Sequence, residues 1–260
     1  TVWVQPAAGD AGTALGAALW VDAQVRGDGR RHYRMEHAYL GPEYKDAEIE
    51  TFLSWIGARY SRWSHVDEIA ELLAQERIIG WFQGRMEYGP RALGARSILA
   101  SPIPATMQAR LNAIKDREDF RPVAPVVVEQ EAANWFEGCG ESPYMLFVYN
   151  VRPDCHARIP AVTHVDGTAR VQTLRRTQHA MLYDLILSFA DRTGVPILVN
   201  TSFNTRGEPI VCTPRDALEC FFTSPLDALV MGQFLVQKPD YANDTTRIGG
   251  RAHLQTPALT

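Results

Sequence analysis

The spacing of apolar positions predicts several amphipathic helices. Apolar residues three and four positions apart recur in residues 14–19, 49–56 and 181–189, as they do on one face of a helix. Ser64 with Asp67 forms a capping-box pattern, and Thr213 before Pro214 is typical of a helix start. Besides the short helix around residues 14–19, helices are therefore expected over residues 46–60, 64–75 and 177–194, and from residue 214 onward.

Short runs rich in β-branched and aromatic residues predict strands between these helices. Because the two kinds of element are mixed without strict alternation, we expect an α/β (α+β) fold, with a twisted mixed sheet flanked by helices and considerable antiparallel pairing. A short strand at 2–4 and a loop of small residues at 6–12 should precede the first helix. The other strands are expected at residues 78–82, 97–100, 125–128, 144–150, 197–200 and 228–236.

A polar stretch rich in arginine and glycine, residues 26–34, divides the chain. We interpret residues 1–25 as the last piece of a domain whose body is absent, and residues 26–45 as a linker. Residues 46–238 should form the main domain. Residues 239–260 contain few apolar positions and are expected to be a mobile tail. The chain starts without Met, so a processed or excised piece is expected.

Composition limits the classes of function that fit this chain. With 260 residues, of which 46% are hydrophobic and 22% charged, it can bury a sizeable core. Its formal charge of −4 gives no net positive field, so a nucleic-acid partner is not expected. The four cysteines form no CxxC pair, and the chain has neither an 18-residue apolar run nor a signal peptide. A cytoplasmic protein without a membrane partner is expected.

The segment GWFQGRMEYGPRALGAR, residues 80–96, has the composition of a polyanion site. It places Arg85, Arg91 and Arg96 among four glycines. Glycine lets the backbone turn sharply near a ligand, and guanidinium groups offer paired donors to phosphate oxygens. A surface loop in which these arginines pair with Glu87 and neighbouring acids fits the same residues equally well.

Three further segments carry polar residues that fit a ligand site. Lys115 and Arg121 lie in IKDREDFRPVAP, where a solvated charge run is the alternative, although lysine occurs only three times in the chain. Arg170 lies in THVDGTARVQT, which alone predicts an ordinary hairpin. Asn200 and Ser202 end a buried strand in PILVNTSFNTRGEP. They are placed either to hold a ligand or to satisfy the backbone of their own turn.

Five strings resemble those of the antibiotic and nodulation-factor O-carbamoyltransferases. They occur in order along the chain: QPAAGDAGTALGAAL, GRMEYGPRALGARSILA, FRPVAPVV, DGTARVQTL and LVNTSFNTRGEPIVCTP. Members of that family have an amino-terminal Kae1-like domain, of the ASKHA class, and a carboxy-terminal YrdC-like domain. The resemblance implies that residues 46–238 form the YrdC-like domain and residues 1–25 a remnant of the Kae1-like one. The rest of that Kae1-like domain would be a partner.

What the resemblance implies chemically is an ATP-dependent reaction in two steps. Carbamoyl phosphate and ATP, with Mg²⁺, would give carbamoyl-adenylate, and the carbamoyl group would then pass to a hydroxyl of an aminoglycoside-like acceptor. Arg91, Lys115 and Arg121 would be catalytic and, together with Arg170, would bind the phosphate and carbamoyl groups, while Asn200 and Ser202 would hydrogen-bond the carbamoyl or phosphate end.

Asp10 matches an acid that, in the family, binds an iron-like metal (Fe²⁺ or similar) together with two histidines four residues apart. The seven histidines of this chain include no such pair, since His32 and His37 are five apart. This chain alone is therefore not expected to hold that metal well. Asp10 also fits a different role, as the residue that caps the following helix.

Two other functions remain open from the sequence. One is a YrdC-like carbamoyl-adenylate synthase that serves threonylcarbamoylation of tRNA. The acidic net charge and the five strings favour the antibiotic-type family over it. The other is a non-enzymatic module that docks an acidic partner on its arginine- and glycine-rich loop.

Overall fold

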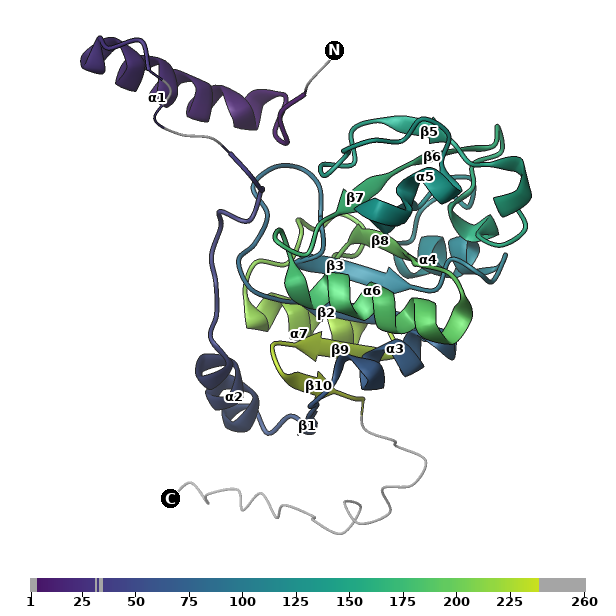
Figure 1. Ribbon diagram of the computed structural model, residues 1–260. Helices are drawn as coiled ribbons and strands as arrows, with labels where there is room; N and C mark the ends of the chain where they lie inside the picture. Colours follow the sequence, from purple (N-terminus) through teal and green to yellow (C-terminus); the bar gives the residue numbers. More distant parts are fainter. Residues whose placement is uncertain (1–3, 31, 33–34, 239–260) are drawn as a thin grey trace, which may run out of the picture.

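Runs of buried residues form the centre of an eight-stranded sheet in the computed structural model, which describes residues 4–30, 32 and 35–238 (Figure 1). The strand order is β1-β10-β9-β2-β3-β8-β4-β7. The β2/β9 and β4/β7 pairs are parallel and the others antiparallel, so the mixed sheet predicted from the sequence is confirmed. The strands are β1 (Tyr60–Arg62), β2 (Ile79–Phe82), β3 (Arg96–Ala100), β4 (Ala124–Val128), β7 (Gln172–Leu174), β8 (Ile197–Ser202), β9 (Ala228–Met231) and β10 (Phe234–Val236).

Two of the predicted strands were wrong in extent. Residues 228–236 form two antiparallel strands, because the chain reverses at Gly232, whose φ of 55° favours glycine. Of residues 144–150, only β5 (Val148–Asn150) is a strand, and it pairs with β6 (Thr168–Arg170) in a separate two-stranded sheet. Met145 has a φ of 54°, which interrupts the extended backbone before β5. The edge strand β1 was not predicted.

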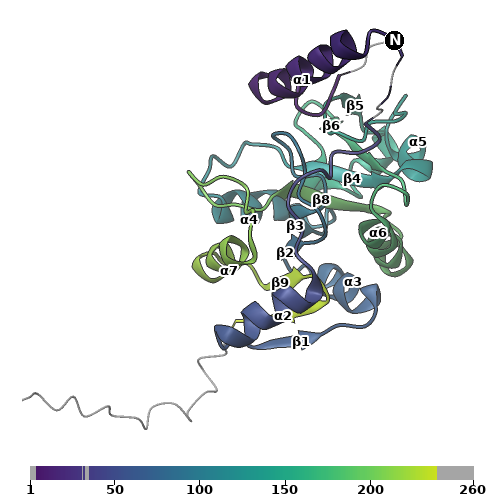
Figure 2. The ribbon, with the colours of Figure 1, turned by 90° about the vertical axis from the view of Figure 1, so that its left-hand side faces the viewer.

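Helices cover both faces of the large sheet. Helices α3 and α6 pack together on one side, and α4 and α7 lie on the other (Figure 2). Short 3₁₀ turns at Glu129–Glu131, Pro153–Cys155 and Pro160–Val162 lie in the connections. The helices of this main body are α2 (Asp46–Trp55), α3 (Val66–Ala74), α4 (Met107–Ile114), α5 (Ala132–Trp135), α6 (Ala180–Thr193) and α7 (Pro214–Thr223).

The ends of two helices follow local capping rules. The Thr213 hydroxyl accepts a hydrogen bond from the Asp216 amide at 3.2 Å, and the Asp216 carboxylate accepts one from the Thr213 amide at 2.9 Å. This reciprocal pair fixes the start of α7 as predicted. Helix α6 ends, as expected, at Gly194, with a φ of 71°. It begins three residues later than the predicted Thr177, because His179 is its N-cap.

The start of α3 uses a different acid from the one predicted. Glu68, not Asp67, accepts hydrogen bonds from the backbone amides of Ser64 at 2.9 Å and His65 at 3.3 Å. The Asp67 carboxylate instead accepts a hydrogen bond from the Ser188 hydroxyl at 2.5 Å. That contact joins α3 to α6 and is one reason why the two helices pack together.

Helix α1 (Asp10–Arg26) stands apart from the rest (Figure 1, Figure 2). It starts inside the predicted loop at 6–12 and has no buried residue. The Tyr88 hydroxyl donates to the carbonyl of Ala11 at 2.6 Å, which ties the start of α1 to the β2–β3 loop. Residues 2 and 3 of the predicted first strand and the predicted tail at 239–260 lie outside the described residues. No helix within the described part of the chain is both long and apolar enough to cross a bilayer.

Strand directions gather several loops at one end of the large sheet. In the register of the sheet, Phe82 pairs with Arg96, Ser97 with Ser202, and Asn200 with Ala124. Strands β2 and β8 therefore end where β3, β4 and β7 begin. The β2–β3 loop, the α4–β4 loop and the β8–α7 loop all lie at this end, where they bring together residues far apart in the sequence.

Candidate anion-binding site

Lys115 directly follows α4 and reaches the end of β8. It is 6% exposed, and its Nζ donates to the Ser202 carbonyl at 2.5 Å, the Ser202 hydroxyl at 3.1 Å and the Asn204 side-chain oxygen at 2.8 Å. Burial first, and then repulsion from Arg117, lowers the pKa of Lys115 from 10.5 to about 7. All of its acceptors are neutral, so the ammonium charge lacks a counter-ion among them.

Charge repulsion links this lysine to Arg117, and Arg117 in turn to Arg170 and Arg91. Burial, followed by repulsion from Arg91 and Arg117, lowers the pKa of Arg170. Burial, followed by repulsion from Arg121, lowers the pKa of Arg117. Within the described residues, neither Arg91, Arg117 nor Arg170 makes an ion pair with a carboxylate. We call Arg91, Lys115, Arg117 and Arg170 the cation cluster.

Three nitrogens of the cation cluster, Arg91 Nε, Arg117 Nη2 and Arg170 Nε, are buried and have no hydrogen-bond partner among the described residues. Native proteins rarely leave such atoms unpaired, because each costs about 1–3 kcal/mol. A bound anion would satisfy the three nitrogens of the cluster. In the described part of the chain the buried side-chain atoms without a partner are His37 Nδ1, Glu87 Oε2, Arg91 Nε, Arg96 Nε, Arg117 Nη2, Arg170 Nε and Asn200 Oδ1.

The side chain of Glu87 holds the β2–β3 loop in place by hydrogen bonds to the loop's backbone amides. Its buried carboxylate accepts hydrogen bonds from the amides of Leu93 at 2.7 Å, Ala95 at 2.7 Å and Arg96 at 3.3 Å. Burial raises the pKa of Glu87, although these amides lower it. The alternative prediction, in which Glu87 pairs with arginine side chains of its own segment, is therefore wrong.

Of the three arginines in this segment, only Arg91 belongs to the cation cluster. Arg96 is fully buried, where its guanidinium donates to the carbonyls of Gln83 and Gly84, both at 3.1 Å, and lies 3.7 Å over the Phe82 ring. Arg85 is exposed and donates to the carbonyl of Leu40. The polyanion interpretation thus stays a prediction for Arg91, while the other two arginines stabilise the loop.

Asn200 is held by partners far away in the sequence. Its buried amide donates to the Gln172 side-chain oxygen at 2.6 Å and to the Ala92 carbonyl at 3.3 Å. The alternative that Asn200 satisfies its own turn is therefore wrong. Ser202 does make a local contact, since its hydroxyl donates to the Asn204 side chain at 2.8 Å. Both side chains leave β8 on the same face, because they are two residues apart.

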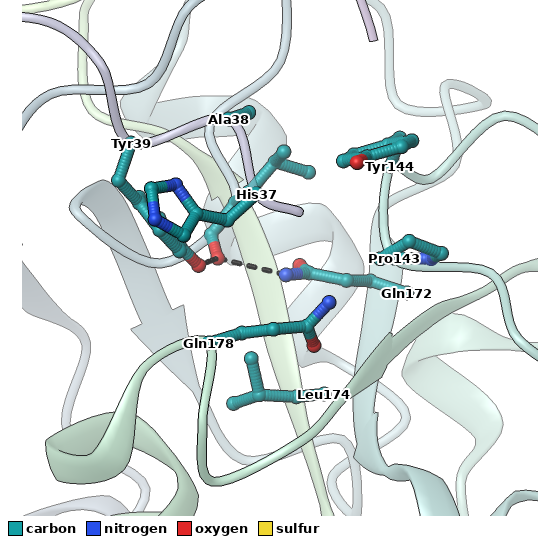
Figure 3. A pocket seen from close by; sticks show the side chains of 9 residues that line it. His37, Ala38, Tyr39, Pro143, Tyr144, Gln172, Leu174 and Gln178 are labelled. Atoms are coloured by element: carbon teal, nitrogen blue, oxygen red, sulfur yellow. Dashed lines mark hydrogen bonds between the residues drawn. The ribbon is translucent and has the colours of Figure 1, made fainter. Parts of the chain in front are cut away.

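A shallow pocket of about 210 Å³, open to solvent, is lined by Gln172, the hydrogen-bond partner of Asn200 (Figure 3). Its wall includes Gln172, whose amide donates to the Leu93 carbonyl at 2.7 Å, and Tyr39, whose hydroxyl donates to the same carbonyl at 2.9 Å. None of its lining residues is Asp, Glu, Lys or Arg, so it differs chemically from the cation cluster. It is lined by His37, Ala38, Tyr39, Leu93, Pro143, Tyr144, Gln172, Leu174 and Gln178.

Arg121 lies at the exposed rim of the site. Its side chain is 55% exposed and makes an ion pair with Glu118 at 2.8 Å. This contact agrees with the charge-run alternative for Arg121. The same alternative is wrong for Lys115, which is buried six residues earlier in the chain. To bind a ligand, Arg121 would have to leave Glu118, which costs little for an exposed pair.

Asp10 is not brought to the cation cluster. It is exposed as the first residue of α1, and the N-cap is Gly9, which makes no side-chain cap hydrogen bond. The capping alternative is therefore wrong. Among the described residues, no group of three or more His, Cys, Asp or Glu side chains is placed to hold a metal ion. Asp10 therefore belongs to no such group among them, and its role as a metal ligand stays a prediction.

Sequence reasoning missed Arg117 and Gln172. Arg117 lies in the same charged run as Lys115, but nothing in the order of charges marks it as half-buried. Gln172 lies two residues after Arg170 and is buried beside Asn200. Its strand, β7, has the sequence Gln-Thr-Leu, so no apolar run marked Gln172 as buried.

The family model described as "Carbamoyltransferase C-terminus" matches residues 70–238, a range that contains the whole cation cluster. The chain belongs to the carbamoyltransferase family. Nodulation protein NolNO of Sinorhizobium fredii is 46% identical over 247 residues, which cover 91% of this chain and 36% of that protein. A 3'-hydroxymethylcephem-O-carbamoyltransferase of Amycolatopsis lactamdurans is 38% identical over 240 residues, which cover 92% and 44%. The chain therefore spans less than half the length of these relatives.

Solved structures of low sequence identity also align with this carbamoyltransferase chain. The structure of P. abyssi Sua5 in complex with L-threonine aligns with a TM-score of 0.49 and 13% identity, covering 65% of this chain and 46% of that one. Full-length HypF in its phosphate- and nucleotide-bound form aligns with a TM-score of 0.44 and 16% identity, covering 66% and 22%.

Proposed function

We propose that this chain is the carbamoyl-adenylate-forming part of an ATP-dependent O-carbamoyltransferase. The observation that carries the proposal is the cation cluster, in which Lys115 is buried with arginines that have no carboxylate partner among the described residues. Membership of the carbamoyltransferase family supports the choice of carbamoyl phosphate as one substrate. ATP is the second substrate, and Mg²⁺ would arrive with its phosphates.

The proposed reaction needs concentrated positive charge more than a nucleophile. Water hydrolyses carbamoyl phosphate to carbamate and phosphate, and a carbamate oxygen then attacks the α-phosphorus of ATP. A new oxygen–phosphorus bond forms, the bond to the bridging oxygen breaks, and pyrophosphate leaves with the electron pair. Fixed cations in a water-poor site stabilise the charge that spreads over these oxygens.

The predicted site residues take distinct roles in this proposal. Arg91, Lys115 and Arg170 would bind phosphate oxygens, with Arg121 closing from the rim. Asn200 and Ser202 would hydrogen-bond the carbamoyl end, since they lie on one face of β8 beside Lys115. Lys115 would exchange its neutral acceptors for a phosphate oxygen, which would restore its pKa towards the ordinary value.

The second step would require a domain beyond the described residues. We propose that a Kae1-like domain transfers the carbamoyl group to a hydroxyl of an antibiotic-type acceptor, such as an aminoglycoside. An iron-like metal would belong to that domain, with Asp10 as the ligand that the sequence resemblance assigns to this chain. A role in tRNA modification is less well supported, since the net charge of −4 provides no broad positive surface for RNA.

The proposal predicts carbamoyl-phosphate-dependent exchange of labelled pyrophosphate into ATP by this chain with Mg²⁺. Exchange requires reversible adenylate formation, so a module that only docks an acidic partner gives none. The control omits carbamoyl phosphate and should show no label in ATP. If a folded sample gives no exchange, even after an amino-terminal carbamoyltransferase domain is added, the proposed function is wrong.

A further inference from the structure

A tight turn just before β6 brings together the side chains of His164, Asp166 and Thr168. The amide of His164 donates to the Thr168 carbonyl at 2.7 Å, and the amide of Gly167 donates to the His164 carbonyl at 2.9 Å. Gly167 has a φ of 79°, a value that favours glycine. The turn therefore sets the His164 imidazole beside Thr168, the first residue of β6.

Hydrogen bonds across this turn fix which nitrogen of His164 carries the proton. The Thr168 hydroxyl donates its single proton to the Asp166 carboxylate at 2.7 Å, and the Thr168 amide donates to the same oxygen at 3.0 Å. The hydroxyl oxygen is then the acceptor for His164 Nδ1, which lies 3.0 Å away. The proton of the neutral imidazole is thus on Nδ1, and Nε2 presents a lone pair.

His164 is a neighbour of the cation cluster and is neutral at pH 7. Thr168 and Arg170 are two residues apart on β6, so their side chains leave the strand on the same face. Burial lowers the pKa of His164, the charge of Asp166 opposes this effect, and the charge of Arg170 adds to it. A ligand held by Arg170 would therefore meet an imidazole that can accept a proton.

A proton acceptor is the kind of group that the cation cluster does not supply. Lysine and arginine in their charged forms donate hydrogen bonds and accept none. Hydrolysis of carbamoyl phosphate needs a proton removed from water. Attack on phosphorus gains little from a base, because the transition state of phosphoryl transfer is loose. Attack of water on the carbonyl carbon gains much more, so a base at this place fits attack on carbon.

We propose that His164 is the general base that activates water against carbamoyl phosphate, held in the required tautomer by Thr168 and Asp166. Nε2 takes a proton from water as the water oxygen bonds to the carbonyl carbon. The bond from that carbon to the bridging oxygen then breaks, and phosphate leaves with the electron pair and takes the proton from Nε2. The remaining carbamic acid loses its own proton to give carbamate. This inference rests on the proposed function, whose first step it describes.

Two sources of carbamate separate a base from a structural residue. A solution of ammonium bicarbonate contains carbamate at equilibrium, so it can support pyrophosphate exchange without hydrolysis of carbamoyl phosphate. We expect His164→Gln to lower exchange with carbamoyl phosphate about 10²-fold and to leave exchange with ammonium bicarbonate unchanged. The matched control is His32→Gln, because His32 is exposed and contacts Asp28 at 2.7 Å. An equal loss with both sources would overturn the inference, as would no loss with either.

Phosphate release from carbamoyl phosphate tests the inference apart from the proposed function. If neither source supports exchange, even with the amino-terminal domain added, the proposed function fails. The inference stands in that case if the wild type releases phosphate and His164→Gln does so about 10²-fold more slowly. A wild type that releases none would overturn it. In water labelled with a heavy oxygen isotope the released phosphate should carry no label, and labelled phosphate would overturn attack on carbon.

Variants of Thr168 test the hydrogen-bonded chain that holds His164. Thr168→Val removes the hydroxyl and should slow phosphate release about tenfold, since Nδ1 loses the acceptor that fixes its proton. Thr168→Ser keeps the hydroxyl and should restore most of the rate. A serine variant as slow as the valine variant would overturn the positioning role of the Thr168 hydroxyl.

Discussion

Replacing Lys115 with Met should lower the rate of carbamoyl-phosphate-dependent pyrophosphate exchange by about 10²-fold or more. Met preserves much of the length and apolar stem of lysine but removes the charge next to Ser202. The measurement is the initial exchange rate at saturating ATP, compared with the thermal stability of each sample. A folded Lys115→Met variant with wild-type exchange would show that the cation cluster does not carry the reaction.

The chain supplies a matched control for this substitution. Lys45 is exposed and pairs with Glu43 at 2.8 Å, just before α2. Lys45→Met makes the same chemical change outside the cation cluster and should leave exchange unchanged. A comparable loss in both variants would point to a general charge effect instead of a local one.

The lowered pKa of Lys115 also predicts a pH dependence of ATP affinity. Above about pH 7 the ligand-free lysine loses its proton, so binding must recover that proton and ATP affinity should fall as pH rises. The phosphates of ATP are already ionised above about pH 7.5, so they should contribute little to this slope. In Lys115→Arg the side chain stays charged, and the slope should disappear. An equal slope in both proteins would assign it to another group.

Replacing Glu87 with Ala should reduce the free energy of unfolding by about 3 kcal/mol or more, which is the second large effect. The substitution leaves the buried amides of Leu93, Ala95 and Arg96 without their acceptor, at about 1–3 kcal/mol for each orphaned group. Urea denaturation monitored by tryptophan fluorescence would measure the loss, provided that the slope with denaturant stays constant.

Glu87→Gln is the appropriate control for that loss. Glutamine keeps a side-chain oxygen that can accept the same backbone hydrogen bonds, and it removes the cost of a buried charge. We therefore expect a much smaller loss of stability than in Glu87→Ala. If the two variants are equally destabilised, the carboxylate charge matters more than its role as an acceptor.

Much of the secondary structure could be predicted because its determinants are local. Helix α7 begins at Pro214 because Thr213 and Asp216 cap each other within one turn. Strands β2, β3, β4 and β8 were expected from short apolar runs, which are stable only when buried on both faces. The hairpin at Gly232 was missed because both of its strands are apolar, so hydrophobicity alone did not mark the turn.

The sequence by itself determined the mixed α/β class and the segments that carry polar and charged residues suited to a ligand site. It also singled out Lys115, because lysine is scarce in this chain. Only the tertiary structure decided which of these residues meet, because strand register and burial are set by contacts between distant segments. Burial made Arg96 a support for its own loop and left Arg91 in the cation cluster. The direction of β8 brought Ser202 to Lys115, 87 positions earlier in the chain. The arrangement of α4 turned Asn112, an ordinary residue in the sequence, into the partner of Arg117.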